Sequence, residues 1–285
     1  MEKKLSQPQN PQSRFQPQKR LGQHFLKNRA VLAKIVAAAD LKPRDLVLEI
    51  GPGQGALAQE LAKGAGKVVA IEKDARLIPI LKENLKEFKN VEVIQEDILK
   101  YKLRSTKDGL PTSDFRLRTS YKVVANLPYY AATHIIRQFL EAKHKPELMV
   151  LMVQKEVGQR ICAKPPEMTL LAVAVQLYAQ VKIVGYVSKK AFWPRPKVDG
   201  AIIKLKVKNE KRKANEERFF QIVKAGFSQP RKQILNNFVK KLNLTREKIT
   251  AWLLKSGVRP EQRPSTLTLE NWLDLAKGFK SSFPE

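Results

Sequence analysis

Asn126, Leu127, Pro128 and Tyr129 form the segment of this chain best suited to chemistry on an aromatic amine. The exocyclic amine of adenine is a poor nucleophile because its lone pair is delocalised into the ring. The Asn126 side-chain oxygen and the Leu127 carbonyl can accept hydrogen bonds from it, which favours a pyramidal nitrogen aimed at a methyl donor. Pro128 stiffens the loop, and Tyr129 can stack on the base. A strand-ending turn with a buried Tyr would also explain these four residues.

A glycine-rich stretch, 49–55, supplies the features of a nucleoside-binding loop. Glycine lets the backbone turn sharply and approach a ligand closely, although the G-x-G-x-G spacing differs from the dinucleotide fingerprint. Glu72 and Asp97 end or follow the next two apolar runs. We expect Glu72 to accept ribose hydroxyls and Asp97 to accept the adenine amino group. The order of these features places a nucleoside at the carboxyl edge of a sheet.

The residue before the glycines discriminates between two cofactors. NAD needs its pyrophosphate near a helix N-terminus. Glu49 is better suited to the cationic end of a cofactor that carries an amino acid. The loop therefore favours S-adenosylmethionine over NAD, and we expect no metal in the site.

The segment Phe192–Asp199 resembles a second aromatic platform flanked by prolines and cations. We expect Phe192 to close over the other face of an everted base, with Arg195 and Lys197 on phosphates, and we assign Trp193 to the core. Stacking contributes about 1–3 kcal/mol per base, comparable to the few kcal/mol that base eversion costs.

These residues require an α/β scaffold. Continuous apolar strands separated by helices indicate a parallel sheet covered on both faces. The prediction is a doubly wound, mostly parallel, seven-stranded Rossmann-like methyltransferase sheet, its last two strands an antiparallel pair. The expected strands are 46–50, 68–71, 91–95, 121–125, 148–153, 181–187 and 201–207. The expected helices are 29–39, capped by Asn28, 56–63, and one capped by Asp74 whose start Pro79 kinks or shortens.

The domain organisation follows from changes in pattern. Residues 1–20 are predicted to be a disordered basic tail, 21–208 the methyltransferase domain, and 209–285 a small all-helical C-terminal domain. Within the last domain the periodicity predicts helices at 217–227, 231–242, 246–255 and 269–279. The polar connection 100–120 is expected to be a surface insertion.

Composition indicates the kind of partner. The chain carries 54 Lys and Arg against 27 Asp and Glu, a net charge of +27, so a polyanion is expected nearby. The basic residues are spread along the chain rather than gathered on one membrane-binding helix, which favours nucleic acid over an acidic membrane surface. No apolar run is long enough to span a bilayer, and a cytoplasmic location is expected. The single cysteine, Cys162, excludes an intrachain disulfide, and we place it in a helix.

Taken together, these segments resemble the ribosomal RNA adenine dimethyltransferase family of the KsgA type over nearly the full chain. The matching segments are 21–26, 49–55, Glu72, 96–97, 126–129, 154–157, 192–199, 227–235 and 263–264. The resemblance implies cofactor contacts from His24, Leu26, Gly51, Glu72, Asp97 and Asn126, with Asn126 and Tyr129 at the target amine. It also implies dimethylation of two neighbouring adenosines in a hairpin loop near the 3′ end of small-subunit ribosomal RNA, and the pre-small-subunit particle as partner. We expect a monomer.

Residues 165–171 depart from the family, which usually has a Gly-Ser-Lys stretch there, so the resemblance assigns no RNA contact to this loop. Three other functions remain open: a ribosome assembly factor that binds RNA without methylating it, a large-subunit rRNA adenine methylase, and a DNA adenine methylase.

Overall fold

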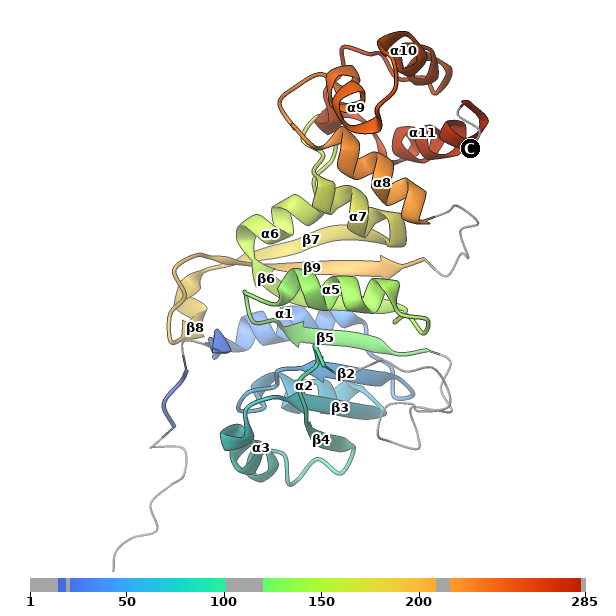
Figure 1. The fold of residues 1–285 in the computed structure, drawn as a ribbon. Coiled ribbons are helices and arrows are strands. Elements are labelled where there is room, and N and C mark those ends of the chain that lie inside the picture. Colours follow the sequence, from blue (N-terminus) through green and yellow to red (C-terminus); the bar gives the residue numbers. More distant parts are fainter. Residues whose placement is uncertain (1–14, 19–20, 101–119, 209–215, 283–285) are drawn as a thin grey trace, which may run out of the picture. The chain divides into compact units, whose positions relative to one another are not determined.

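The computed structural model describes residues 15–18, 21–100, 120–208 and 216–282. Their main feature is a seven-stranded sheet with the order β4-β3-β2-β5-β6-β9-β7 (Figure 1). Neighbouring strands from β4 to β6 run parallel, and β9 runs antiparallel to β6. The strands are β2 (Leu46–Ile50), β3 (Lys67–Glu72), β4 (Val91–Gln95), β5 (Lys122–Asn126), β6 (Leu148–Gln154), β7 (Ala179–Val187) and β9 (Gly200–Val207). The predicted sheet is confirmed, and β9 and β7 are neighbours within it.

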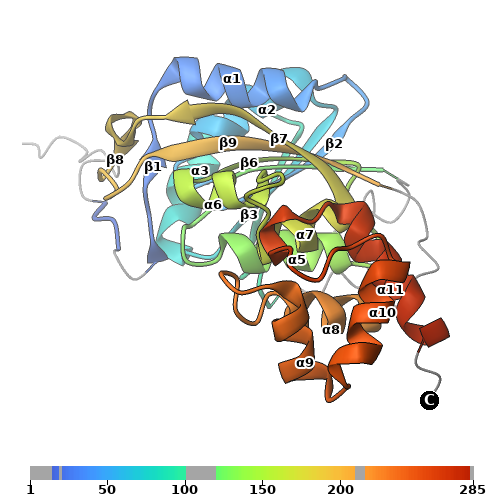
Figure 2. The same cartoon turned by 90° about the horizontal axis from the view of Figure 1, so that it is seen from above.

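Helices cover both faces of this sheet, as the doubly wound prediction requires. The helix α1 (Arg29–Ala39) lies on one face, whereas α5 (Ala132–Glu141) lies on the other (Figure 2). The α1 helix begins where predicted, because the Asn28 side chain accepts a hydrogen bond from the Val31 amide at 3.1 Å. The sequence analysis did not predict α5, which buries one apolar face containing Ile135 and Phe139.

The connections that end in the candidate site also match their sequence signals. The helix α2 (Ala56–Gly64) directly follows the glycine-rich stretch. After β3, Asp74 caps a 3-10 turn, η3 (Ala75–Leu77), and α3 (Ile78–Asn84) starts only then, with Pro79 in its first turn. The ring of Pro79 is tolerated there because the first turn of a helix needs no amide donor.

A buried ion pair joins the end of α1 to strand β5. The Lys122 side chain is 7% exposed and donates hydrogen bonds to the carbonyls of Ala39 at 3.2 Å and Asp40 at 2.8 Å. The same ammonium reaches Asp45 Oδ2 at 2.7 Å. A buried charge is costly unless it is fully partnered, and these three acceptors partner it.

A second, two-stranded sheet pairs distant parts of the chain. Strand β1 (Phe25–Leu26) runs antiparallel to β8 (Phe192–Trp193), with Phe25 opposite Trp193 and Leu26 opposite Phe192. Successive side chains of a strand point to opposite faces, so Leu26 and Phe192 share one face, and Phe25 and Trp193 share the other. The first pair is buried in the core.

The other compact unit comprises residues 156–182 and 208–285, and six helices dominate those of its residues that the structure describes. They are α6 (Lys155–Ile161), α7 (Leu170–Tyr178), α8 (Glu216–Gly226), α9 (Ile234–Leu242), α10 (Arg246–Lys255) and α11 (Leu269–Ser282). Residues 156–182 therefore belong to the same compact unit as the C-terminal helices, whereas the sequence analysis placed them in the first domain. Trp252 and Trp272 form its core, at 1% and 0% exposed.

Two details differ from the sequence predictions. Cys162 follows the last residue of α6 instead of lying within a helix, and it is half-buried. The helix expected from 231 begins at Ile234, because residues 228–232 form turns and bends. The predicted tail at 1–20 lies almost wholly, and the insertion at 100–120 mostly, outside the described residues. No helix in the described part of the chain is long and apolar enough to cross a membrane.

Candidate active site

A cavity of about 330 Å³ opens at the carboxyl ends of β2, β3 and β5. Its size lies at the lower end of the roughly 300–1,000 Å³ typical of small-molecule sites. Seven of the eight predicted site residues line it: His24, Leu26, Gly51, Glu72, Asp97, Asn126 and Tyr129. Strand ends thus bring together residues that are far apart in sequence, and Phe192 is the exception.

The glycine loop after β2 adopts the conformations that its composition predicts. Gly51 and Gly53 have φ values of +65° and +61°, a region that side chains disfavour. A Cβ on Gly51 would meet no atom within 4 Å, whereas one on Gly53 would lie 2.8 Å from the Phe25 ring. Gly51 therefore presents bare backbone to the cavity, and Gly53 lets β1 pack against the loop.

Glu72 is held rigidly at the end of β3. Its carboxylate accepts hydrogen bonds from the Gly53 amide at 3.1 Å and from the Asp74 amide at 2.8 Å. Burial raises the pKa of Glu72, and these amides oppose that shift. Each carboxylate oxygen has two lone pairs, so Glu72 can still accept hydroxyl groups from a ligand in the cavity.

Glu49 is the most unusual group in the cavity wall. It is 2% exposed, and its Oε2 atom has no hydrogen-bond partner among the described residues. Burial raises the pKa of Glu49 well above its ordinary value, and the nearby Glu72 carboxylate raises it further. A buried acceptor without a donor is costly, so this atom calls for a ligand that brings a cationic donor. An α-ammonium group fits that requirement.

Asp97 is an anion in a different setting. Its Oδ2 lies 2.7 Å from the Lys73 ammonium, and its Oδ1 accepts the Leu99 amide at 3.0 Å. Burial works to raise the pKa of Asp97, but the bonds from Lys73 and Leu99 outweigh it and hold that pKa below its usual value. A ligand amino group at Asp97 must share the carboxylate with Lys73.

Asn126 has one of its two polar ends committed. Its Nδ2 donates to the His24 carbonyl at 2.9 Å, which fixes the amide orientation and turns the Oδ1 acceptor away from that bond. His24 is anchored in turn, since its Nδ1 lies 2.7 Å from the Pro194 carbonyl. Sequence reasoning did not anticipate this chain of contacts between the residue after β8, the residue before β1 and the last residue of β5.

The Tyr129 ring lines the cavity 5.7 Å from the His24 ring. Its hydroxyl is buried and has no hydrogen-bond partner within the described residues. Burial, with a smaller contribution from Asp199, raises the pKa of Tyr129 to about 12. Tyr129 therefore stays neutral near pH 7 and offers an aromatic surface rather than a base.

The predicted roles of Phe192 and Trp193 need correction. Phe192 is 5% exposed, belongs to the core cluster and does not line the cavity, so its ring is not available to a base in this arrangement. Trp193, assigned to the core from sequence, is 41% exposed. The pleat of β8 explains both errors, since neighbouring residues face opposite sides.

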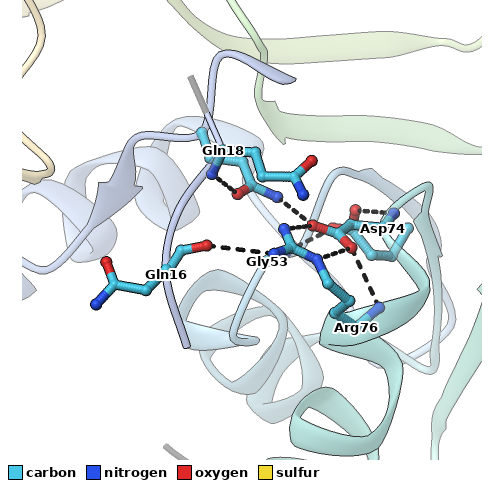
Figure 3. Close-up of polar contacts among 7 residues, drawn as sticks. Gln16, Gln18, Gly53, Asp74 and Arg76 are labelled. Carbon is cyan, nitrogen blue, oxygen red and sulfur yellow. Dashed lines mark hydrogen bonds and ion pairs between the residues drawn. The ribbon is translucent and has the colours of Figure 1, made fainter. Parts of the chain in front are cut away.

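The sequence analysis missed a polar network beside Glu72, drawn in Figure 3. Arg76 donates two hydrogen bonds to the Asp74 carboxylate, from Nε at 2.9 Å and from Nη2 at 2.5 Å. These bonds lower the pKa of Asp74. The Gln23 side chain donates to Asp74 Oδ2 at 2.7 Å. The only sequence signal was Asp74 as a helix cap.

The N-terminal segment joins this network. The Gln18 amide donates to Gln23 Oε1 at 2.8 Å, and Arg76 Nη1 donates to the Gln16 carbonyl at 3.4 Å (Figure 3). The Arg76 guanidinium also lies 5.1 Å from the centroid of the Phe15 ring, which packs edge-on against Phe25. Residues 15–18 thereby contact two residues that line the cavity, Gln23 and Phe25.

Comparisons with known proteins agree on one family. The family described as "Ribosomal RNA adenine dimethylase" matches residues 14–281. A "Ribosomal RNA small subunit methyltransferase A" of Dehalococcoides mccartyi is 43% identical over 256 residues, covering 89% of this chain and 85% of the relative. The protein of the same name from a Geobacillus species is 40% identical over 273 residues, covering 93% and 92%.

Solved structures give the same picture. A dimethyladenosine transferase from Plasmodium falciparum superimposes with a TM-score of 0.75 at 28% identity, covering 91% of this chain and 98% of the other. The 23S rRNA methyltransferase ErmE gives a TM-score of 0.71 at 28% identity, covering 89% and 98%.

Proposed function

We propose that this chain, which belongs to the ribosomal RNA adenine dimethylase family, dimethylates the N6 amines of two adjacent adenosines in a hairpin loop near the 3′ end of small-subunit ribosomal RNA. Members of this family are S-adenosylmethionine-dependent enzymes, and the cavity fits that cofactor. The observation that carries the proposal is the pair of acceptors in one cavity: the unpartnered Glu49 Oε2 and the oriented Asn126 Oδ1.

The cofactor half of the cavity supplies binding and orientation. Glu49 would hold the α-ammonium group, Gly51 would let the ligand lie against the backbone, and Glu72 would accept the ribose hydroxyls. Asp97 would accept the adenine amino group beside Lys73. His24 and Leu26, from the segment that includes β1, would complete the wall. When bound, S-adenosylmethionine supplies a methyl group on a positively charged sulfur.

The acceptor half prepares the target amine. Asn126 Oδ1 and the Leu127 carbonyl would accept hydrogen bonds from the two N6 protons and favour a pyramidal nitrogen. Because Asn126 Nδ2 is already bonded to His24, the amide cannot rotate and present its donor end to the amine without breaking that bond. Tyr129 would stack on the adenine ring.

No strong general base is required for the proton balance. The nitrogen lone pair would form the new N–C bond while the bond between the methyl carbon and sulfur breaks and its electron pair stays on sulfur, which leaves a neutral thioether. The nitrogen would become cationic and acidic, so one N6 proton can leave to water. The methylated amine keeps its other proton for one of the two acceptors, and the second transfer replaces that proton in the same way. Tyr129, with a pKa of about 12, is not suited to remove it.

The substrate assignment is supported by similarity and by charge. Relatives that carry the small-subunit name are 39–44% identical, whereas the large-subunit enzyme ErmE is 28% identical. The net charge of +27 suits a phosphate-rich partner such as the pre-small-subunit particle. Supplying labelled cofactor to isolated small and large subunits distinguishes the two substrates. We further propose that the protein is a cytoplasmic monomer. Sedimentation of the free chain tests the oligomeric state.

The decisive variant is Asn126→Ala. It should lower kcat on unmethylated small subunits by roughly 10²–10³, the effect of removing one oriented hydrogen-bonding group from an active site. Cofactor affinity, measured by equilibrium dialysis, should change by less than about tenfold. Asn236→Ala, an exposed position on α9, is the matched control. Full activity of Asn126→Ala would refute the mechanism, and failure of the unaltered protein to bind cofactor would favour an assembly factor that does not methylate.

A further inference from the structure

We propose that Trp193 forms, with Phe25 and Lys27, a stacking site for an RNA base that neighbours the target adenosine. This inference rests on the proposed function, because it concerns how the same RNA is held beside the cavity. It gives a role to the exposed part of the Trp193 ring, which does not line the cofactor cavity.

The ring of Trp193 is displayed by the small sheet. In β8 the side chain of Phe192 points into the core, so Trp193 must point the other way, and 41% of it is exposed. Its ring stacks on Phe25 of β1, with centroids 6.2 Å apart and an angle of 27° between the planes. A large apolar ring in water gains by covering its surface, and a nucleobase matches its shape and size.

Two residues connect this ring to the cavity. Phe25 and Lys27 both line the cavity, and both contact Trp193. Pro194, the residue after Trp193, has its carbonyl oxygen 2.7 Å from His24 Nδ1. The His24 carbonyl in turn accepts the hydrogen bond from Asn126. A base on Trp193 would therefore be held at a fixed position relative to the loop that faces the target amine. Trp193 itself does not line the cavity, which is why it suits a neighbouring base and not the target.

The charges around the ring suit an RNA backbone. The Lys27 ammonium lies 4.7 Å from the ring centroid and is exposed, so a base can displace it toward the adjoining phosphate. This exchange favours binding because stacking on an aromatic ring is stronger than an exposed cation–π contact. Further exposed cations follow on both sides of β8 in the chain: Lys189, Lys190, Arg195 and Lys197. Asp199 Oδ1 is occupied by the Lys189 amide at 3.0 Å.

Single-stranded RNA is favoured over a protein partner for this site. A protein contact would need a contiguous apolar patch, whereas here the exposed Trp193 ring has the Lys27 ammonium against it and exposed lysine and arginine residues close by in the chain. Aromatic rings interleaved with cations are the arrangement that proteins use to hold unpaired bases.

Tryptophan fluorescence isolates this site. The chain has three tryptophans, and Trp252 and Trp272 are 1% and 0% exposed, so only Trp193 is open to a stacked base. Titration of the full chain with short oligoadenylate should quench part of the emission. Trp193→Phe should abolish the quenching while keeping the affinity, measured by anisotropy of labelled oligoadenylate, within about threefold. Trp193→Leu should raise the Kd by about tenfold, the effect expected for one lost stacking contact.

Activity on unmethylated small subunits provides the second test. Trp193→Leu should raise KM by about tenfold and leave kcat within about twofold, with cofactor affinity unchanged as the sign of an intact fold. Tyr186→Leu is the matched control, because Tyr186 is 53% exposed, has Lys155 at 5.2 Å from its ring, and lies outside the β1–β8 sheet. Asn126→Ala should retain the fluorescence quenching while losing methylation, so failure of the two proposals can be distinguished.

Three outcomes would overturn the inference. Unchanged quenching in Trp193→Phe would place the responding ring elsewhere. Equal losses in Trp193→Leu and Tyr186→Leu would indicate general surface binding. Unaltered KM in Trp193→Leu, with weak oligoadenylate binding throughout, would leave a protein partner as the occupant of this surface.

Discussion

Replacement of Glu49 by Gln should stabilise the ligand-free protein and weaken cofactor binding. Glu49 is 2% exposed, its Oε2 atom lacks a partner among the described residues, and burial raises its pKa well above the ordinary value. Glutamine has the same shape but carries no charge that burial penalises. The variant therefore separates the stability cost of this carboxyl group from its use in binding.

The pH dependence has a definite sign. In the unfolded chain Glu49 ionises near its ordinary pKa of 4.5, whereas the folded protein holds the proton to a higher pH. Between these two pKa values the native state binds one more proton, so stability falls by about 1.4 kcal/mol per pH unit as pH rises. The contribution is fully present below the unfolded pKa and is lost as pH rises through the folded pKa. Glu49→Gln has no such slope.

The assay is thermal unfolding without cofactor across pH 5 to 8. The Tm of the variant should rise relative to that of the unaltered protein as pH rises, by roughly 2–4 °C for each kcal/mol of difference in unfolding free energy. Cofactor affinity should fall by roughly 10- to 100-fold, which is the value of a hydrogen bond to a charged group. Glu60→Gln, the same change at a half-exposed position on α2 where the carboxylate pairs with Lys63, is the control. A stability difference that does not depend on pH, or an unchanged affinity, would refute the argument.

Two further substitutions test the supports of the site. Lys122→Ala should lower the free energy of unfolding by about 3–5 kcal/mol, because it leaves the Asp45 carboxylate, whose side chain is only 14% exposed, without its ion-pair partner, and urea unfolding measures this. Arg76→Ala should release Asp74 and Phe15, increase amide hydrogen exchange of residues 15–18 and weaken cofactor binding several-fold, whereas unchanged exchange would show that this guanidinium does not hold the segment.

The sequence predicts the cavity well because its residues follow strands. Gly51, Glu72 and Asn126 each end or follow a continuous apolar run, and the carboxyl ends of parallel strands meet at one edge. A buried run followed by a polar residue is a local signal, so it can be recognised without the fold. The unusual state of Glu49 also follows from its position in the apolar stretch of β2.

Other features depend on contacts that no local pattern carries. The face on which Phe192 lies is set by pairing with β1, and a strand of two residues is too short to reveal its own alternation. The helix α7 is apolar on nearly all sides, LLAVAVQLY, so its periodicity does not distinguish helix from strand, and it was not predicted. The grip of Arg76 on residues 15–18 joins positions about 60 residues apart.

The pairing of β1 with β8 also has a consequence for biosynthesis. His24 and Pro194 are 170 positions apart, so the wall that carries His24 acquires its anchor only after β8 has been translated. Contacts of such long range slow folding, because a large loop must close before they form. A nascent chain that ends at β6 contains all the parallel strands, yet it lacks β8 and Pro194, which hold β1 and His24 in place. The ability to hold cofactor should therefore appear late in synthesis, and pulse-labelled truncations that end before and after Pro194 should differ sharply in ligand retention.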